Sequence, residues 1–248
     1  VLPFLPPVLH EERYVEMSPK QKKAYTQMRD FMIAELEDGD TVMAPSPLTQ
    51  MTRLLQFSVA FAELVEDPVT GETVTQLSDP SATLDAIMDD ISNGDFGEGS
   101  GAISAGGPGS KQLINLLSAR LEKAKIPHGM ITGDLSMDIR QKSIDEFQSG
   151  EIKFILYTVQ AGGTGVTLTE ARRLLRILRP YSLIDDLQSN DRVHRIGSEK
   201  HDSIMITDYI TKDTVQQRVQ EILDDKAESA EEVMRDRQQV LNMLKADK

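Results

Sequence analysis

The chain has 248 residues, of which 39% are hydrophobic, and a formal net charge of −13 at pH 7. It is long enough for one large domain with extensions, and no apolar run approaches the roughly 18 residues of a transmembrane helix, so no membrane partner is expected. The absence of cysteine excludes disulfides, thiolate metal sites and cysteine nucleophiles. The negative charge excludes a nucleic-acid binder that uses its whole surface, so such contact would need a local groove.

Residues 1–80 are expected to form an extended lead, two helices and a β-hairpin. Val15 and Met17 alternate with polar neighbours, as in a short strand. Ser18-Pro19 is typical of a helix N-terminus, with serine as the cap and proline in the first turn. A second helix is predicted from about Pro47 to Phe57. Residues 62–77 then have the pattern of a hairpin with its turn at 68–71.

A glycine-rich segment follows the helix that Pro80-Ser81 opens. Seven glycines occur in the sixteen residues from Gly94 to Gly109. Little apolar surface is available there, so the segment is predicted to be a flexible loop. A phosphate cradle made of its amides is the alternative, but neither a Lys-Ser nor a Lys-Thr pair follows Gly109.

Beyond residue 110, helical and strand patterns alternate. Helices are predicted at 110–124, 136–150, 182–196 and from 213 onward, and strands at 128–132, 152–158, 174–178 and 203–210. The last helix begins with Asp213 and Gln216 at the spacing of a capping box. Alternating strands and helices imply a parallel α/β sheet flanked by helices. Residues 224–248 are charged and form a peripheral or partly frayed helix.

The most informative stretch is Gln188–Gly197. It places Gln188, Asp191, Arg192 and Arg195 at positions i, i+3, i+4 and i+7, which share one face of a helix. Two guanidiniums flanked by an amide and a carboxylate suit a multiply charged oxyanion such as a triphosphate. A solvated helix face with i,i+4 pairs explains the spacing equally well.

A second glycine-rich run, residues 157–169, directly follows a predicted strand. The carboxyl ends of parallel strands are where open α/β sheets bind ligands, and glycine lets the backbone approach a phosphate closely. Taken alone, the Gly-Gly-Thr-Gly sequence at 162–165 is explained as well by a tight structural turn.

Together these two runs resemble motifs V and VI of the Swi2/Snf2 ATPases of helicase superfamily 2. Residues 188–197 have the motif VI form Q-x-x-D-R-x-H-R-x-G. Thr167 and Ser198 stand where asparagine and glutamine are usual, and only Ala102–Ala105 could serve as the strand of motif IV. The resemblance implies a second RecA-like lobe: a parallel sheet flanked by helices, with an N-terminal helical and hairpin extension (1–80), the lobe itself (81–223) and a C-terminal helix (224–248).

The resemblance also assigns roles to individual residues. Arg192 and Arg195 would be arginine fingers. Arg140 would either pin its helix to the sheet, which is favoured, or join the phosphate surface, and His194 would be a lobe-packing or coupling residue. The remaining assignments are nucleotide contacts at Gln188, Asp191 and Gly165, and DNA-backbone contacts at Thr132, Gly133, Thr158, Gly162, Gly163 and Thr164. The four histidines of the chain lack metal-ligand spacing, so no metal site is expected.

Hydrolysis of ATP needs a Walker A lysine and a Walker B acidic pair, and neither motif occurs here. We therefore expect the second half of a two-lobed motor, with ATP and Mg²⁺ held mainly by an N-terminal RecA-like lobe, and with DNA, duplex being favoured, contacted through its backbone. The isolated chain is expected to be inactive. Lack of chromatin-reading insertions favours a bacterial or phage protein in the cytoplasm over a nuclear eukaryotic one.

Two other interpretations remain. The first is a non-catalytic DNA- or protein-interaction module derived from such a lobe, which the altered motif IV and the acidic surface favour. The second is a nucleotide-binding enzyme of another α/β class. The absence of a Gly-x-Gly-x-x-Gly turn disfavours a dinucleotide site.

Overall fold

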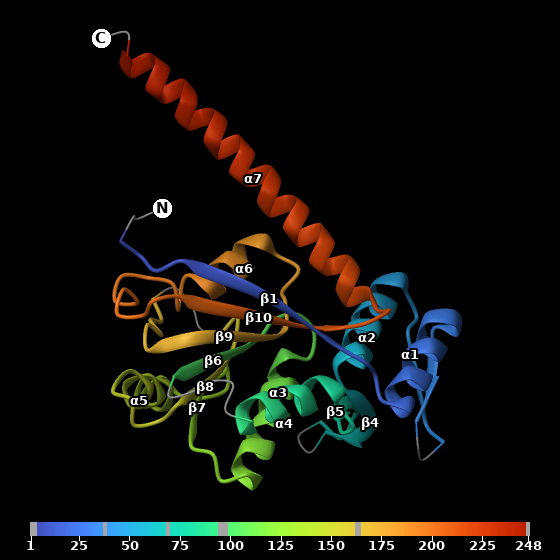
Figure 1. The fold of residues 1–248 in the computed structure, drawn as a ribbon. Helices are drawn as coiled ribbons and strands as arrows, with labels where there is room; N and C mark the ends of the chain where they lie inside the picture. Colours follow the sequence, from blue (N-terminus) through green and yellow to red (C-terminus); the bar gives the residue numbers. More distant parts are fainter. Residues whose placement is uncertain (1–3, 37–38, 68–69, 94–98, 162–164, 247–248) are drawn as a thin grey trace.

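A computed structural model describes residues 4–36, 39–67, 70–93, 99–161 and 165–246, with side chains through residue 230. Its centre is a six-stranded sheet in the order β1-β10-β9-β6-β8-β7, and every neighbouring pair is parallel (Figure 1). The strands are β1 (Val8–Val15), β6 (Ser100–Ala105), β7 (His128–Ile131), β8 (Phe154–Thr158), β9 (Ala171–Leu178) and β10 (Ile204–Thr211). The predicted parallel α/β sheet is confirmed.

Helices cover both faces of this sheet. They are α1 (Pro19–Phe31), α2 (Pro47–Val59), α3 (Ala82–Ser92), α4 (Ser110–Lys123), α5 (Met137–Gln148), α6 (Leu183–Asn190) and α7 (Val215–Ala246). The α3 and α4 helices lie on one face, and α5 and α6 on the other (Figure 1). The predicted helix starts at Pro19 and Pro47 are confirmed, because Ser18 and Ser46 cap α1 and α2 through their hydroxyls.

Beyond the carboxyl end of β1 lie α1, α2 and two small antiparallel pairs (Figure 1). The predicted hairpin is confirmed as β4 (Phe61–Glu66) paired with β5 (Thr73–Ser78), although residues 68–69 of its turn lie outside the described residues. A shorter pair, β2 (Ile33–Glu35) with β3 (Thr41–Met43), was not predicted.

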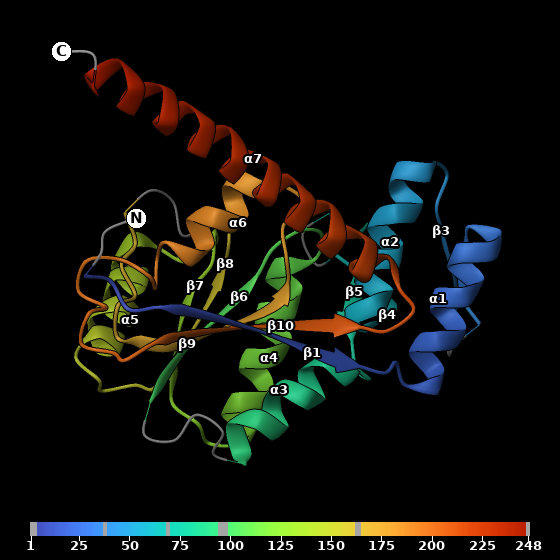
Figure 2. The same ribbon diagram turned by 45° about the horizontal axis from the view of Figure 1, so that its top comes forward.

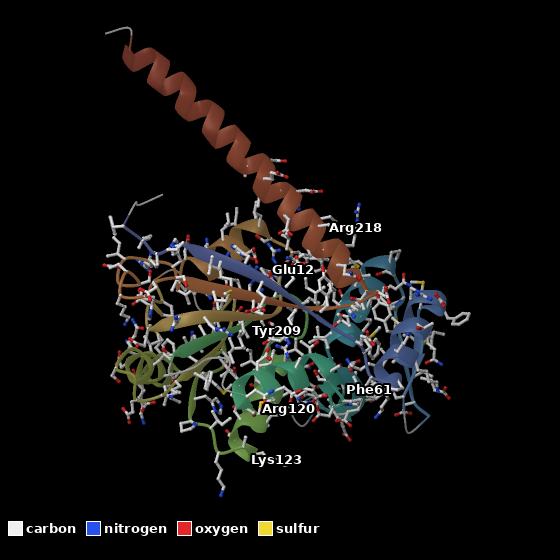
Figure 3. All side chains as sticks on the ribbon, viewed as in Figure 1. Glu12, Phe61, Arg120, Lys123, Tyr209 and Arg218 are labelled. Carbon is white, nitrogen blue, oxygen red and sulfur yellow. The ribbon has the colours of Figure 1, made fainter. Side chains whose placement is uncertain are left out.

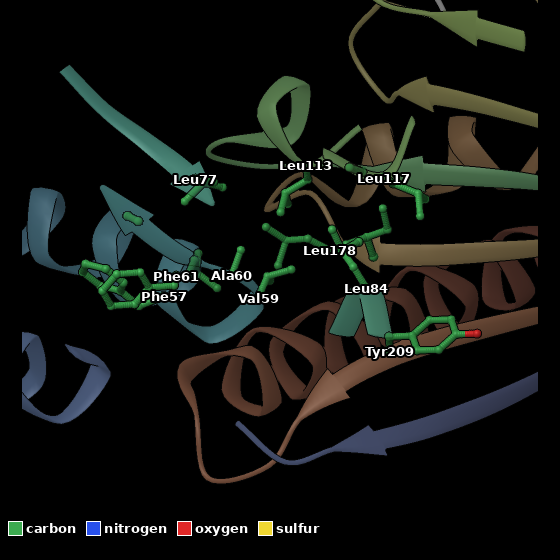
Figure 4. Close-up of a cluster of buried hydrophobic side chains, with 14 of the residues drawn as sticks. Phe57, Val59, Ala60, Phe61, Leu77, Leu84, Leu113, Leu117, Leu178 and Tyr209 are labelled. Carbon is green, nitrogen blue, oxygen red and sulfur yellow. The ribbon is translucent and has the colours of Figure 1, made fainter. Parts of the chain in front are cut away.

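The core divides at the sheet, because successive side chains of each buried strand point to opposite faces. In β8, Leu156 packs with the cluster under α3 and α4, whereas Ile155 and Tyr157 pack with the cluster under α5. Figure 4 shows part of the first cluster, in which Leu84 of α3 and Leu113 of α4 lie close to Leu178 at the end of β9. Burial of both sheet faces is what a parallel sheet requires.

The segment predicted to be a glycine-rich loop contains a central strand, so that prediction was wrong for residues 100–105. The β6 strand lies between β9 and β8, and Ala102, Ile103 and Ala105 have no exposed surface. Small residues lack the usual strand signature, yet they suit a strand that helices cover on both faces. This strand contains Ala102–Ala105, the segment that the sequence analysis named as the candidate for the strand of motif IV. Residues 94–98 lie outside the described residues.

Close packing explains the glycine that follows β6. The Gly106 amide donates to the carbonyl oxygen of Leu178 at 2.7 Å, and a Cβ on Gly106 would lie 2.5 Å from the backbone nitrogen of Pro180. This contact joins the carboxyl ends of β6 and β9.

Substituting Gly106→Ala is expected to lower the free energy of unfolding by about 1–3 kcal/mol, because backbone atoms of Pro180 would have to move. The melting temperature measured by circular dichroism should fall by about 3–10 °C. Gly133→Ala is the matched control, since a Cβ there meets no atom within 4 Å. Equal melting temperatures for the two variants would contradict the packing argument.

Two segments differ from what the sequence predicted. The β1 strand pairs with β10 along its whole length, so residues 8–15 belong to the main sheet and are not an extended lead. At the other end, Thr214 caps α7 in place of the predicted Asp213, whose φ of 58° is left-handed. Gln216 nevertheless accepts a hydrogen bond from the Thr211 amide.

The α7 helix continues across the predicted boundary at residue 224 and extends away from the body (Figure 1). The division of the chain at residues 80 and 223 stays a prediction. Among the described residues, no helix combines the length and the apolar character needed to cross a membrane.

Candidate functional site

The helix that carries the predicted arginine pair ends at Asn190, earlier than the predicted residue 196. Residues 191–197 form turns because the carbonyl oxygen of Arg192 accepts from the Leu168 amide at 2.8 Å and is not used for a further helical turn. The four predicted side chains therefore do not share one helical face. A tertiary hydrogen bond, invisible in local sequence, overrides the helical pattern here.

Arg192 is buried, with 5% of its surface exposed. Its guanidinium carbon lies 5.0 Å from the centre of the Tyr157 ring, and its Nη2 donates to the carbonyl oxygen of Val159 at 2.7 Å. Its Nε and Nη1 are buried and have no hydrogen-bond partner among the described residues. Leaving such donors unpaired in a folded protein is costly.

Arg195 differs from Arg192 in being exposed. Its Nη1 lies 3.4 Å from the hydroxyl oxygen of Thr167, the residue that stands where asparagine is usual in motif V. The two arginines contact loop 159–170 near its two ends. Because this loop runs from the carboxyl end of β8 to the amino end of β9, the site is not confined to the carboxyl edge of the sheet as the strand-end argument predicted.

The turn after α6 is held by contacts with distant segments. Nε2 of His194 lies 2.9 Å from the carbonyl oxygen of Pro6, in agreement with the structural role expected for this histidine. Gly197 has a φ of 108° and packs against Thr169. The Gly197 amide donates to Glu199, and backbone hydrogen bonds of this kind lower the pKa of the Glu199 carboxyl.

The residues predicted to contact nucleotide beside the arginines are all accessible. Gln188 lies on α6, Asp191 follows it directly, and both are exposed. Gly165 is exposed as well, and its φ of 116° favours glycine. These assignments stay predictions.

The residues predicted to contact DNA differ from one another in how exposed they are. The Thr132 side chain is buried and donates to Asp134 at 2.7 Å, and this bond, together with Lys111 3.1 Å away, holds the pKa of Asp134 below its usual range. Gly133 is exposed, whereas Thr158 is buried. Gly162, Gly163 and Thr164 lie outside the described residues. Contact with DNA by this group stays a prediction, and backbone atoms are better placed for it than the two threonine hydroxyls.

Arg140, which had been assigned either to the fold or to the phosphate surface, has a structural contact. Its Nε donates to the carbonyl oxygen of Leu135 at 2.8 Å, which fastens the start of α5. The described residues contain no cluster of histidine and carboxylate side chains suited to a metal ion.

The sequence is similar to those of known helicases. Residues 109–197 match the family described as "Helicase conserved C-terminal domain". The chain is 28% identical over 116 residues to the "ATP-dependent helicase fft3" of Schizosaccharomyces pombe, covering 46% of this chain and 12% of that protein. It is 25% identical over 233 residues to the "Uncharacterized ATP-dependent helicase MG018" of Mycoplasma genitalium, covering 92% of this chain and 21% of that protein.

Solved structures share the fold. The C-terminal part of the Fun30 ATPase domain superposes with a TM-score of 0.66 at 19% identity, covering 88% of this chain and 89% of that one. The C-terminal domain of the Sulfolobus solfataricus SWI2/SNF2 ATPase gives a TM-score of 0.58 at 19% identity, covering 89% and 86%. The chain therefore has the fold of the C-terminal lobes of Snf2-type ATPases, and residues 109–197 match the helicase C-terminal domain. It spans only about a tenth to a fifth of the curated relatives' length.

The lobe also contains a buried ionic network that sequence reasoning missed. Arg176 of β9 contacts Asp208 of β10 through Nε at 2.6 Å and Nη2 at 2.5 Å, and Asp186 of α6 through Nη1 at 3.0 Å. Arg179 contacts the same Asp186 at 2.7 Å and reaches Asp224 of α7 at 2.7 Å. The signal available in the sequence was an arginine in the middle of the apolar strand Leu174–Leu178.

Charge complementarity holds this network together. The side chains of Arg176, Asp186, Asp208 and Arg179 are each less than 10% exposed. Burial alone would lower the pKa of Arg179, but hydrogen bonds and charge from its carboxylate partners raise it above its ordinary value. Buried charges need such complete pairing, because removal of either sign leaves the other desolvated.

Proposed function

We propose that this chain is the second motor lobe of an ATP-dependent DNA translocase or helicase of the Swi2/Snf2 type. The observation that carries the proposal is Arg192, a buried guanidinium with two unpaired donors, three residues before the exposed Arg195. Both arginines adjoin loop 159–170. Guanidiniums in this arrangement suit the charge that develops on a transferring phosphoryl group.

In this proposal the first RecA-like lobe supplies the Walker lysine and the ligands of Mg²⁺, and ATP lies between the lobes. When the lobes close, Arg192 and Arg195 stabilise charge on the γ-phosphate, a contribution typically worth about 10³–10⁵ in rate. Loop 159–170 contacts the arginines, so the same closure moves its backbone against a DNA strand. The helicase names of the relatives support this class of activity.

One set of observations favours a second candidate, a non-catalytic DNA- or protein-interaction module. The net charge is −13, and Asp134 lies beside two of the residues proposed to contact DNA. An acidic side chain at that position weakens attraction to phosphate. Under this candidate, however, the unpaired donors of Arg192 have no purpose, so we favour the motor.

The two candidates predict different hydrolysis rates. The two-lobed protein should hydrolyse ATP with Mg²⁺, and duplex DNA should increase the rate, whereas the isolated 248-residue chain should hydrolyse none. The measurement is phosphate release with and without DNA, using the first lobe alone as the matched control. A first lobe that reaches the full DNA-stimulated rate without this chain would contradict the proposal.

A further inference from the structure

The α6 helix, which precedes the arginine pair, buries its polar residues more completely than its apolar ones. It has eight residues, and its fully buried residues are Asp186 and Ser189, both polar. Ile184 and Leu187 on the same helix are 67% and 48% exposed. An isolated helix this short is unstable in water, so contacts with the rest of the lobe must hold it. Those contacts include ion pairs and hydrogen bonds of Asp186, Ser189 and Asn190, together with apolar packing of Leu183.

Two anchors hold the last turn of α6. Nη1 of Arg176 contacts Asp186 at 3.0 Å and Asn190 at 3.3 Å, two residues before Arg192. The Tyr157 hydroxyl lies 2.9 Å from the hydroxyl oxygen of Ser189, and the ring of this tyrosine supports Arg192. Displacement of α6 would therefore move Arg192 away from the ring on which it stacks.

We propose that Arg176 and Arg179 are positioning residues that hold α6 where Arg192 and Arg195 can reach phosphate, and that the Arg179–Asp224 pair makes this position depend on the packing of α7. The inference rests on the proposed function for its consequence in catalysis. Its structural part concerns only the anchoring of α6 by Arg176, Arg179 and Asp224.

The α7 helix is linked to the ionic network through the Arg179–Asp224 pair. Arg179 uses Nε and Nη2 for Asp186 and the remaining Nη1 for Asp224, so one guanidinium bridges α6 and α7. Figure 2 shows α7 passing over α6. A pocket of about 400 Å³ lies beside this bridge and is lined by residues of β1, β9, β10, α6 and α7. Leu183 of α6 packs against the apolar cluster that includes Val219 and Leu223 of α7, so apolar packing accompanies the ionic bridge.

Hydrogen exchange of amides 187–195 in this chain tests the anchoring. Asp224→Asn should speed their exchange by about two- to fivefold, the effect of losing a half-exposed ion pair. Arg179→Lys keeps the positive charge, but a lysine ammonium cannot reach the carboxylates of both Asp186 and Asp224 as the guanidinium does. This variant should therefore speed hydrogen exchange of amides 187–195 on the order of tenfold. Asp224→Glu should restore slow exchange.

Asp225→Asn is the matched control, because it removes the same charge from the next residue of α7, which is also exposed. Its exchange at 187–195 should equal that of the unchanged chain. If Asp224→Asn and Asp225→Asn gave the same exchange, or if Arg179→Lys had no effect, the inference would be overturned.

The catalytic consequence is measured separately in the two-lobed protein. Arg179→Lys should lower kcat for DNA-stimulated ATP hydrolysis about tenfold and change KM little, since the arginines act on the transition state. An unchanged kcat with accelerated exchange would overturn the positioning role. Failure of the proposed function has a different signature: Arg195→Ala would leave hydrolysis unchanged while the exchange results remained as expected.

Discussion

Arg195→Ala in the two-lobed protein is expected to lower kcat for DNA-stimulated ATP hydrolysis by about 10³-fold or more, the range typical of arginine fingers. The residue suits this test because it is exposed and, among the described residues, its side chain hydrogen-bonds only Thr167, at 3.4 Å, so its removal costs the fold little. Phosphate release at saturating ATP and DNA measures the effect.

Arg218→Ala is the control for loss of a positive charge. Arg218 projects from α7 into solvent and pairs with Glu221 on the same helix (Figure 3). Its hydrolysis rate and its melting temperature should match those of the unchanged protein. An Arg195→Ala variant that keeps near-normal hydrolysis would exclude the arginine-finger role and favour the interaction module.

Arg192 calls for a different substitution because it is buried. Alanine there would remove both the proposed phosphate contact and the stacking on Tyr157, so loss of activity could not be separated from loss of packing. Arg192→Lys retains the charge and much of the aliphatic stem. Near-normal stability with low hydrolysis in this variant would indicate that the planar guanidinium is what the site requires.

Local sequence patterns were sufficient for most elements of the lobe. The starts of α1, α2, α3 and α5 follow from serine caps whose hydroxyls accept the expected backbone hydrogen bonds. Strands such as β8 follow from short apolar runs between helical segments. These features depend on neighbours within a few residues, which is why a single sequence was enough.

Features that depend on distant residues were mispredicted or missed. The glycine that follows β6, Gly106, is required because Pro180 approaches it closely, and that requirement is set some 75 residues later in the chain. The end of α6 depends on the Leu168 amide. The spacing of Arg192 and Arg195 predicted that they share a helical face, but in the structure Arg192 is buried and Arg195 is exposed. Both arginines nevertheless contact loop 159–170, which contains the residues that resemble motif V.

Arg176→Met is expected to destabilise the lobe by about 3–5 kcal/mol, because Asp208 would remain buried without its bidentate partner. For a chain of this length the melting temperature should fall on the order of 10 °C. Thermal unfolding by circular dichroism measures the loss, with Arg218→Met as the exposed control, for which the change should stay within about 0.5 kcal/mol.

The double variant Arg176→Met with Asp208→Leu separates the ion pair from simple loss of packing. It removes both charges while Asp186 keeps its contacts with Arg179, so most of the lost stability should return. Recovery to within about 1 kcal/mol of the unchanged chain would assign the loss in Arg176→Met to an unpaired buried carboxylate. Additive losses would instead mean that the two side chains contribute independently. Because Asn190 loses its Arg176 contact in both variants, faster hydrogen exchange at 187–195 should persist in the double variant even where stability recovers.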